Sequence, residues 1–450
     1  MSAQPPSSWI SVRPNSDFSL SNIPFGIFTP PQPPTSSLLP SPPSPHPRVG
    51  TRVGDTVVDL SALSPILASV CDPSVFSQPT LNEFMGLGRE KWRGVRRILI
   101  SLLSEDGSPT LREDAKLRHK ALFQADRVTM HMPATIGDYT DFFTSRDHAY
   151  NCGCMFRDPS NALYDNFLHL PVGYHGRASS VYVSGTDVVR PFGQVAKVKG
   201  VPAQGSVHVP TGSLDFEMEL GYFLGGPPTD PGHVMTLEEA ESRIFGVVLL
   251  NDWSARDVQA WEYVPLGPFT AKNFATSISP WVVTMDALEP FRCDSVSGLP
   301  SDPKPLAYLA DGSPSHYDIN LTVEIRGKGM TSYETVTSTN AKYLFWSFKQ
   351  QLTHHTVTGC RMNPGDLCGT GTISGKHPSS YGCLLELSWN KTRQVALGST
   401  GESRTFLEDG DTVRMSGFAT ASGAGRVGFG ECTGTILPPG SRPAHPRRPS

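Results

Sequence analysis

Residues 247–276 read VVLLNDWSARDVQAWEYVPLGPFTAKNFAT and join an apolar segment to a polar one. The run 247–250 is continuously apolar, which is typical of a strand buried on both faces. Ser254 and Asp257 have the spacing of a capping box, so we expect a helix to begin there and to end before Pro265. The segment therefore predicts a buried strand that leads directly into a short helix.

Polar side chains gather around the start of this predicted helix. Arg256, Gln259 and Tyr263 recur at i, i+3 and i+7 and share one helix face. Asp252 ends the strand just ahead of the helix, and Lys272 follows in the next loop. An ordinary capped helix with a solvated face is one interpretation, and the wall of a functional site is the other. The apolar residues on the opposite face of the helix favour the interpretation as the wall of a functional site.

A second segment, LDFEMEL at 214–220, alternates acidic and apolar residues. As a strand it projects Asp215, Glu217 and Glu219 from one face. Three carboxylates on one side repel one another unless a cation or a basic side chain neutralises them. A solvated polar face remains the plain interpretation. A cation site is the alternative that would explain the row of acids.

Two more segments carry candidate acid–base groups. Residues 137–157, GDYTDFFTSRDHAYNCGCMFR, are predicted to form a loop that presents Asp141 and His148. Glu386 lies in YGCLLELSW, which is predicted to form a strand. A buried glutamate needs a partner, and an imidazolium is the obvious one.

The charge balance excludes several classes of function. A net charge of −4 and a pI near 6.4 provide no basic surface for nucleic acid or an anionic membrane. No apolar run approaches the roughly 18 residues that span a bilayer, and no secretory signal is recognisable, so we expect a cytoplasmic protein.

The eight cysteines are scattered along the chain. The C-x-C pair at 152 and 154 is weak evidence for zinc, and free thiols are expected.

The rest of the chain is predicted to be mainly β with some α. Its 42 glycines and 41 prolines suit short strands and many turns. Residues 29–48, TPPQPPTSSLLPSPPSPHPR, predict an exposed loop, and residues 49–61 predict strands of a small barrel. Beyond about residue 134 strands predominate, including a hairpin that begins at 316–327.

Two helices are expected from capping residues and apolar spacing. Thr80 and Glu83 form a predicted capping box, and apolar residues then recur at helical spacing from Trp92 to Leu102. A second helix is predicted from about 340 to 354.

Several of these segments are shared with one known family. The chain is similar to the fumarylacetoacetate hydrolase family from about residue 17 to about residue 437. The matching stretches, in the family's order, are MPATIGDYTDF (132–142), LHLPVGYHGRASS (168–180), LDFEMEL (214–220), NDWSARDVQAWEYVPLGPF (251–269), QQLTHH (350–355) and GTISG (371–375).

The resemblance implies a fold and an activity. It implies a small N-terminal Src-homology-3-like β-barrel in residues 1–133, with 29–48 as an insertion. A C-terminal mixed β-sandwich roll in residues 134–450 would carry the site, in a homodimer. The implied reaction is metal-dependent hydrolysis of a C–C bond in a small β-diketo acid, 4-fumarylacetoacetate, to fumarate and acetoacetate. This is the last step of tyrosine and phenylalanine catabolism.

The resemblance also implies residue roles. The residues matching the family's calcium ligands are Asp141, Glu217, Glu219 and Asp252. Those matching its magnesium site are Asp252, Lys272 and Thr276. The expected catalytic residues are His148 as general base, Glu386 as its partner, and Arg256, Gln259 and Lys272 as the oxyanion hole. The expected substrate contacts are Phe143, Arg157, Tyr174, Gln259, Tyr263 and Thr372. Phe143 stands where the family usually has tyrosine, so one hydroxyl contact is missing.

Two other functions stay open at this point. One is another diketo-acid hydrolase of the superfamily, of the acylpyruvate hydrolase type. Such relatives are typically shorter and lack the N-terminal domain, which residues 17–133 of this chain match. The other is a non-catalytic scaffold stabilised by a metal. The predicted pair of His148 and Glu386, which a scaffold would not need, favours an enzyme.

Overall fold

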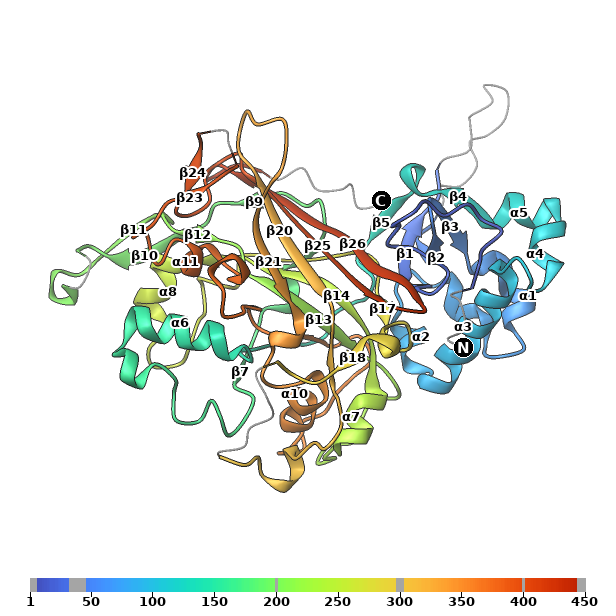
Figure 1. Cartoon of the computed structure of the whole chain (residues 1–450), viewed down its shortest axis with the longest axis horizontal. Coiled ribbons are helices and arrows are strands. Elements are labelled where there is room, and N and C mark those ends of the chain that lie inside the picture. Colours follow the sequence, from blue (N-terminus) through green and yellow to red (C-terminus); the bar gives the residue numbers. More distant parts are fainter. Residues whose placement is uncertain (1–5, 32–45, 199–200, 297–302, 399–400, 443–450) are drawn as a thin grey trace.

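The structure is a computed structural model that describes residues 6–31, 46–198, 201–296, 303–398 and 401–442 (Figure 1). Most of the proline-rich segment, residues 32–45, lies outside the described residues. Its described flanks are the end of strand β1 (Phe25–Thr29) and the start of β2 (Arg48–Val53). No helix in the described part of the chain is long and apolar enough to cross a membrane.

The N-terminal part contains a five-stranded antiparallel sheet, drawn in blue and cyan in Figure 1. The strand order is β4 (Leu122–Gln124), β3 (Thr56–Asp59), β2, β1 and β5 (Thr129–His131). Strands within 49–61 are therefore confirmed, and the Src-homology-3-like closure stays a prediction.

The single helix predicted to begin at Thr80 is two helices in the structure. Helix α2 (Asn82–Gly86) follows Leu81, and no side chain caps it, so the capping box at Thr80 is wrong. Helix α3 (Arg89–Leu103) begins after Gly88, whose φ of 85° separates the two helices. The apolar face of α3 is buried as its spacing indicated.

The C-terminal part is built on an eight-stranded mixed sheet. Its order is β7 (Gly173–His175), β6 (Tyr139–Phe142), β22 (Leu367–Gly369), β13 (Met218–Leu224), β14 (Ile244–Asp252), β16 (Thr276–Ile278) and β8 (Val181–Val183), with β17 (Val283–Thr284) paired to β14. The β6–β22 and β8–β16 pairs are parallel.

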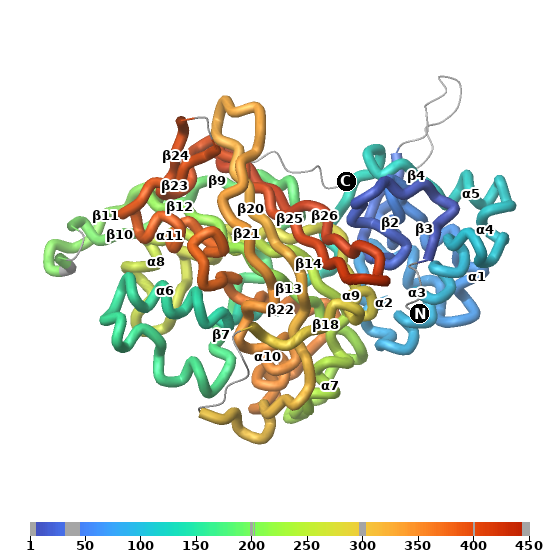
Figure 2. The backbone as a smooth tube through the Cα atoms, viewed as in Figure 1, coloured from blue at the N-terminus to red at the C-terminus, as the bar shows by residue number. Residues whose placement is uncertain are grey.

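A second sheet packs against the first. Its order is β21 (Glu334–Asn340), β20 (Asn320–Arg326), β25 (Thr412–Ala421), β26 (Ala424–Leu437) and β9 (Val188–Val189). Strands β20 and β21 confirm the predicted hairpin. Figure 2 shows the orange and red strands crossing β13 and β14. The two sheets are in close contact, because a Cβ at Gly417, on β25, would lie 3.1 Å from the Leu249 side chain of β14. The mainly β class is confirmed.

The remaining elements are short. Five of the other helices are α1 (Ser64–Leu67), α4 (Pro109–Glu113), α5 (Ala115–Ala121), α7 (Leu237–Arg243) and α9 (Met285–Leu288). Three small hairpins or pairs are β10 (Phe192–Ala196) with β11 (Ser206–Pro210), β18 (Arg292–Cys293) with β19 (His316–Tyr317), and β23 (Val395–Ala396) with β24 (Ser403–Arg404).

The N-terminal part and the large sheet share one apolar core. The ring of Phe245, on β14, lies 6.0 Å from that of Phe25, 5.8 Å from Phe84 and 5.0 Å from Trp92, between centroids. Phe25 and Val282 also exchange two backbone hydrogen bonds, of 3.0 and 2.8 Å. The two parts are therefore joined by buried aromatic packing.

Segments that carry candidate site residues differ from the sequence predictions. LDFEMEL is not one strand: β12 (Leu214–Asp215) ends before Phe216, and β13 begins at Met218. Residues 137–157 form β6 and helix α6 (Arg146–Phe156) instead of a loop. Glu386 lies in the short helix α11 (Leu384–Leu387), not in a strand.

Two predicted helix starts are also wrong, for identifiable reasons. Ser254 lies in β15 (Ser254–Ala255), and helix α8 (Arg256–Glu262) follows it. The Ser254 hydroxyl donates to Glu217 and the Asp257 carboxylate accepts from the Gly212 amide, so neither caps the helix. The last predicted helix, α10 (Phe348–His355), begins at a capping box of Ser347 and Gln350, later than residue 340.

Candidate active site

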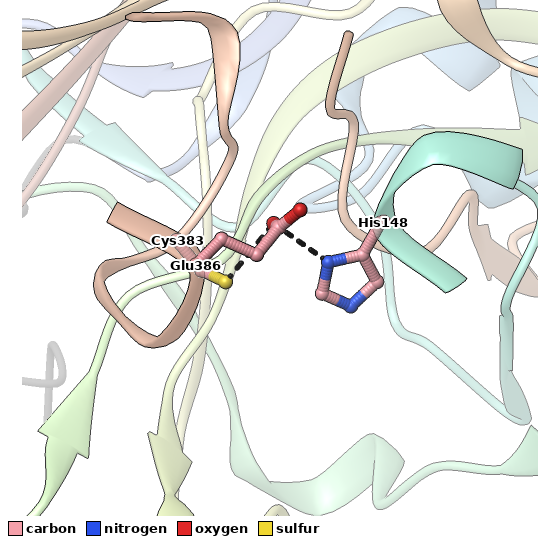
Figure 3. Close-up of side chains that lie close together, drawn as sticks. All are labelled: His148, Cys383 and Glu386. Carbon is pink, nitrogen blue, oxygen red and sulfur yellow. Dashed lines mark hydrogen bonds and ion pairs between the residues drawn. The ribbon is translucent and has the colours of Figure 1, made fainter. Parts of the chain in front are cut away.

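Helix α6 and helix α11 bring His148 and Glu386 together (Figure 3). The imidazole Nδ1 lies 2.7 Å from Glu386 Oε2, and both side chains are buried. Asn151, on the next turn of α6, donates to Oε1 at 2.8 Å, and the Ser374 hydroxyl donates to Oε2 at 2.7 Å. The carboxylate is thus held on both oxygens, and it orients the ring.

The electrostatics of this pair make the imidazole of His148 strongly basic. Burial alone would lower the pKa of His148, but neighbouring Cys152 and Glu386 raise it well above its ordinary value. Burial alone would raise the pKa of Glu386, but the attraction of His148 and the hydrogen bonds lower it. Nε2, the other ring nitrogen, lies 3.9 Å from Glu217 Oε1.

Three buried carboxylates converge from three strands of the large sheet. Asp141 lies on β6, Glu219 on β13 and Asp252 at the end of β14, and one oxygen from each lies within 4.8 Å of the others. Gly369, on the strand between β6 and β13, leaves room for them. A Cβ there would lie 2.8 Å from Asp141 Oδ1 and 3.1 Å from Glu219 Oε2.

This carboxylate cluster fits a hard divalent cation. Burial and mutual repulsion raise the pKa of Glu219 and of Asp252 well above their ordinary values. Burial raises the pKa of Asp141 to about 6, against the opposing attraction of Lys272. Asp141 Oδ1 is buried and accepts no hydrogen bond from the described residues. An all-oxygen donor set with an unsatisfied buried oxygen is what Ca²⁺ or Mg²⁺ requires.

Glu217 lies beside this cluster but contacts basic groups. Its Oε1 accepts from Arg256 at 2.7 Å and from the Thr372 hydroxyl at 2.8 Å. Its Oε2 contacts the Lys272 ammonium group. Burial alone would raise the pKa of Glu217, but Arg256 and Lys272 hold it well below its ordinary value. Its predicted role as a cation ligand stays a prediction.

The second predicted cation group, Asp252, Lys272 and Thr276, is also assembled. Lys272 Nζ contacts Asp252 Oδ2, and the Thr276 hydroxyl lies 3.4 Å from Asp252 Oδ1. Burial alone would lower the pKa of Lys272, but Asp252 and Glu217 raise it, so the ammonium stays charged. This charge neutralises part of the carboxylate cluster.

Arg256 links helix α8 to the strands and to α11. Its Nε donates to Asp215 Oδ2 at 2.9 Å, and its Nη1 lies 3.2 Å from Gln259 Oε1. Asp215 also accepts from the backbone amides of Leu384 and Leu385, at 2.7 and 2.9 Å. Asp215 therefore supports the segment that carries Glu386, which agrees with a structural role for this acid.

These residues surround one cavity of about 570 Å³. All the predicted site residues line it except Asp252, Thr276 and Glu386, which lie behind its wall. The Arg157 guanidinium stacks on the Tyr164 ring at 3.9 Å, and Tyr263 is partly exposed.

Sequence reasoning missed several contributors. Asn151 and Ser374 hold Glu386, Gly369 makes room for the carboxylates, and Cys383 donates to Glu386 Oε2 at 3.3 Å. The i, i+3 spacing of His148 and Asn151 on a helix was the only available signal, and the segment had been predicted as a loop. The others come from distant segments.

Two family models match almost the whole chain. The fumarylacetoacetate (FAA) hydrolase C-terminal model matches residues 139–437, and the fumarylacetoacetase N-terminal model matches residues 21–133.

The chain belongs to the fumarylacetoacetate hydrolase family.

Relatives in this family are similar over their full length. The chain is 50% identical to the fumarylacetoacetase of Bos taurus and 48% identical to that of Homo sapiens, each over 96% of this chain and 99% of the relative. It is 47% identical to that of Dictyostelium discoideum, over 97% and 99%. A solved fumarylacetoacetate hydrolase from Exiguobacterium antarcticum aligns over 92% of this chain and 99% of its own, with 17% identity and a TM-score of 0.50, which shows a shared fold.

Proposed function

We propose that this chain hydrolyses the C–C bond of 4-fumarylacetoacetate, giving fumarate and acetoacetate. The observation that carries the proposal is the meeting, at one cavity, of a carboxylate-bound imidazole and a carboxylate cluster. The near full-length similarity to relatives named fumarylacetoacetase supports the same substrate.

His148 is the proposed general base. Glu386 holds the proton on Nδ1, so Nε2 is left to accept the proton of a water in the cavity. Glu386 also stabilises the imidazolium that forms, because its carboxylate is buried and ionised. Proton transfer of this kind contributes roughly 10²- to 10⁴-fold to the rate.

Arg256, Gln259 and Lys272 are the proposed donors to the oxygen on which charge develops. All three line the cavity, and the two basic groups are buried. Because Gln259 Oε1 already accepts from Arg256, its amide nitrogen is the atom available to donate. Loss of a single donor of this type costs roughly 3 kcal/mol of transition-state stabilisation.

We propose that Asp141, Glu219 and Asp252 hold Ca²⁺, with Glu217 joining if it releases Lys272. We propose that Lys272 and Thr276 complete a Mg²⁺ site at Asp252, with Lys272 offering its backbone carbonyl oxygen, because its charged ammonium group has no lone pair for a cation. A bound cation would polarise the diketone oxygens of the substrate and position it. The remaining substrate contacts are proposed to be Phe143, Arg157, Tyr174, Tyr263 and Thr372.

Phe143 presents an apolar edge to the substrate. Its ring packs edge-on against His148 and Phe167, with centroids 5.3 and 6.2 Å away. The residue therefore packs beside the base and offers no hydroxyl to the substrate.

The assembly and location of the protein are further proposals. We propose a cytoplasmic homodimer with an N-terminal domain in residues 1–133 and a C-terminal catalytic domain in residues 134–450, and with all the site residues in the second. Eight free cysteines fit a reducing compartment.

Loss of β-diketone ultraviolet absorbance tests the function. We expect turnover of fumarylacetoacetate that requires a divalent cation, and much slower turnover of acylpyruvates. His148→Ala should retain the fold and the binding of Ca²⁺ at the carboxylate cluster, and lose at least about 100-fold in kcat. A faster reaction with acylpyruvates would favour the other hydrolase class, and cation-dependent stability without turnover of any diketone would favour the scaffold.

A further inference from the structure

A thiol lies beside the proposed base pair, and the mechanism does not use it. Cys383 precedes helix α11 and Glu386 is three residues further on, so both side chains point toward His148 on α6 (Figure 3). Cys383 and Glu386 are fully buried and His148 is nearly so. One donor atom from each of the three lies within 4.8 Å of the other two.

The spacing of these three donors is close to that of a tetrahedral zinc site. Zinc bonds of about 2.0–2.3 Å imply ligand-to-ligand distances of about 3.4 Å for nitrogen to oxygen and about 3.6 Å for sulfur to oxygen. The Glu386 carboxylate lies 3.3 Å from Cys383 Sγ and 2.7 Å from His148 Nδ1. Insertion of an ion requires His148 Nδ1 and Glu386 Oε2 to separate by about 0.7 Å, and the imidazole ring borders the cavity into which it can shift.

The donor types separate this cluster from the carboxylate cluster. Thiolate and imidazole ligands select zinc and similar thiophilic ions, whereas carboxylate oxygens select calcium and magnesium. We infer that His148, Cys383 and Glu386 form a second cation site, for a thiophilic divalent ion such as Zn²⁺, and that its occupation inhibits the enzyme.

The inhibition follows from the atoms that bind. The Cys383 thiol gives up its proton to solvent, and His148 Nδ1 binds the ion through its lone pair. The remaining ring proton then sits on Nε2, the nitrogen that would accept a proton from water. His148 can no longer act as a base while the ion is bound.

Cadmium binding tests the site without relying on any activity. Protein saturated with Ca²⁺ and Mg²⁺ is titrated with Cd²⁺, and sulfur-to-cadmium charge-transfer absorbance is recorded. We expect a tight phase of one equivalent in the unmodified protein. The phase should weaken at least tenfold in Cys383→Ser and in His148→Ala, two variants that each remove a different ligand.

Cys152→Ser is the matched control. The Cys152 thiol touches the same imidazole, 3.6 Å from Nε2, but it lies outside the donor group of Cys383 and Glu386. We expect the cadmium phase to be unchanged in this variant. A tight phase that persists in both Cys383→Ser and His148→Ala, or that disappears only in Cys152→Ser, would overturn the site.

Zinc inhibition of diketone hydrolysis tests the consequence, which rests on the proposed function. With Ca²⁺ and Mg²⁺ in excess, the Zn²⁺ concentration that halves the rate should rise at least tenfold in Cys383→Ser, each variant being compared with its own uninhibited rate. Equal sensitivity of Cys383→Ser and the unmodified protein to Zn²⁺ would mean that zinc inhibits at another site. Absence of any hydrolysis would remove the proposed function, while the cadmium titration would still decide the site.

Discussion

At the scale of single residues, Glu386 shows how a buried charge sets the chemistry of its neighbour. Its two oxygens are bound by the ring of His148, the amide of Asn151 and the hydroxyl of Ser374. Their arrangement leaves Nδ1 of the imidazole committed to the carboxylate. Which ring nitrogen is left for the proposed proton transfer is therefore set by a residue 238 positions further along the chain.

Replacing Glu386 by glutamine tests this coupling. The carboxylate charge raises the pKa of His148, so its removal should lower that pKa and move the acidic limb of the kcat/KM–pH profile to lower pH. The maximal rate should fall by about 10²- to 10⁴-fold, because the imidazolium formed in the reaction loses its counter-charge. Rate measurements across the pH range provide both quantities.

Glu239→Gln is the control for this substitution. Glu239 also pairs with a histidine, His233, at 2.8 Å, but that pair is partly exposed and remote from the cavity. The kcat/KM–pH profile of Glu239→Gln should match that of the unmodified protein. An unshifted profile in Glu386→Gln would remove the carboxylate from control of the base.

At the scale of elements, the four-residue helix α11 depends on contacts from outside itself. Its first two amides donate to Asp215, which also accepts from Arg256. A helix this short has little stability of its own. The position of Glu386 is therefore determined by an acid on β12.

Asp215→Asn should destabilise the protein and slow catalysis together. The amide cannot accept all three hydrogen bonds, and the buried Arg256 loses one of its two carboxylate partners. Breaking a buried pair of this kind costs about 3–5 kcal/mol of the free energy of unfolding. Thermal unfolding and kcat at a temperature where the variant is folded measure the two effects.

The pair of buried Arg190 and partly exposed Asp409, 2.6 Å apart, provides the comparison, because Arg190 also donates to two backbone carbonyls that the substitution leaves in place. Asp409→Asn should cost no more than about 1 kcal/mol and leave kcat unchanged. If the two substitutions had equal effects, Asp215 would have no special role in holding α11.

At the scale of the whole molecule, the N-terminal part is packed onto the large sheet by aromatic rings. Phe245→Ala should lower the free energy of unfolding by about 3–5 kcal/mol, because Phe25, Phe84 and Trp92 lose a common neighbour. Calorimetry should show one unfolding transition in both proteins. Two separate transitions in the unmodified protein would contradict a shared core.

The carboxylate cluster makes stability depend jointly on pH and cation. In cation-free protein the folded state holds the Asp141 proton with a pKa of about 6, above the ordinary value of 3.8. Such a group stabilises the fold below its unfolded pKa, and this contribution is lost as the pH rises through the folded pKa. The contributions of Glu219 and Asp252 to stability depend on pH in the same direction, because the folded state raises both pKa values.

Added Ca²⁺ should therefore raise the melting temperature more at about pH 7.5 than at about pH 5, where protons compete for the same oxygens. At about 100 times its Kd the ion contributes about 2.7 kcal/mol. Melting curves of dialysed protein with and without Ca²⁺ measure the difference. An equal increase in melting temperature at both pH values would mean that Ca²⁺ binds away from the carboxylate cluster.

Some features of this protein were determined by the sequence alone. The apolar run 247–250 identified a buried strand, and the i, i+3 spacing of Arg256 and Gln259 identified two side chains that line the cavity, because both patterns depend on neighbouring residues. The alternation around Ile319 and Ile325 predicted the hairpin for the same reason. Long motifs also identified the family before any contact was known.

Other features were decided only by the tertiary structure. The row of acids in LDFEMEL is divided: Asp215 supports α11, Glu217 binds Arg256 and Lys272, and Glu219 joins the carboxylate cluster. Local periodicity places side chains on a face but does not show which distant partner meets each one. The strands on either side of Phe216 and Glu217 also have different partners, β15 for β12 and β14 and β22 for β13. The partners of a buried charge come from segments far apart in the sequence, so only the folded chain decides its role.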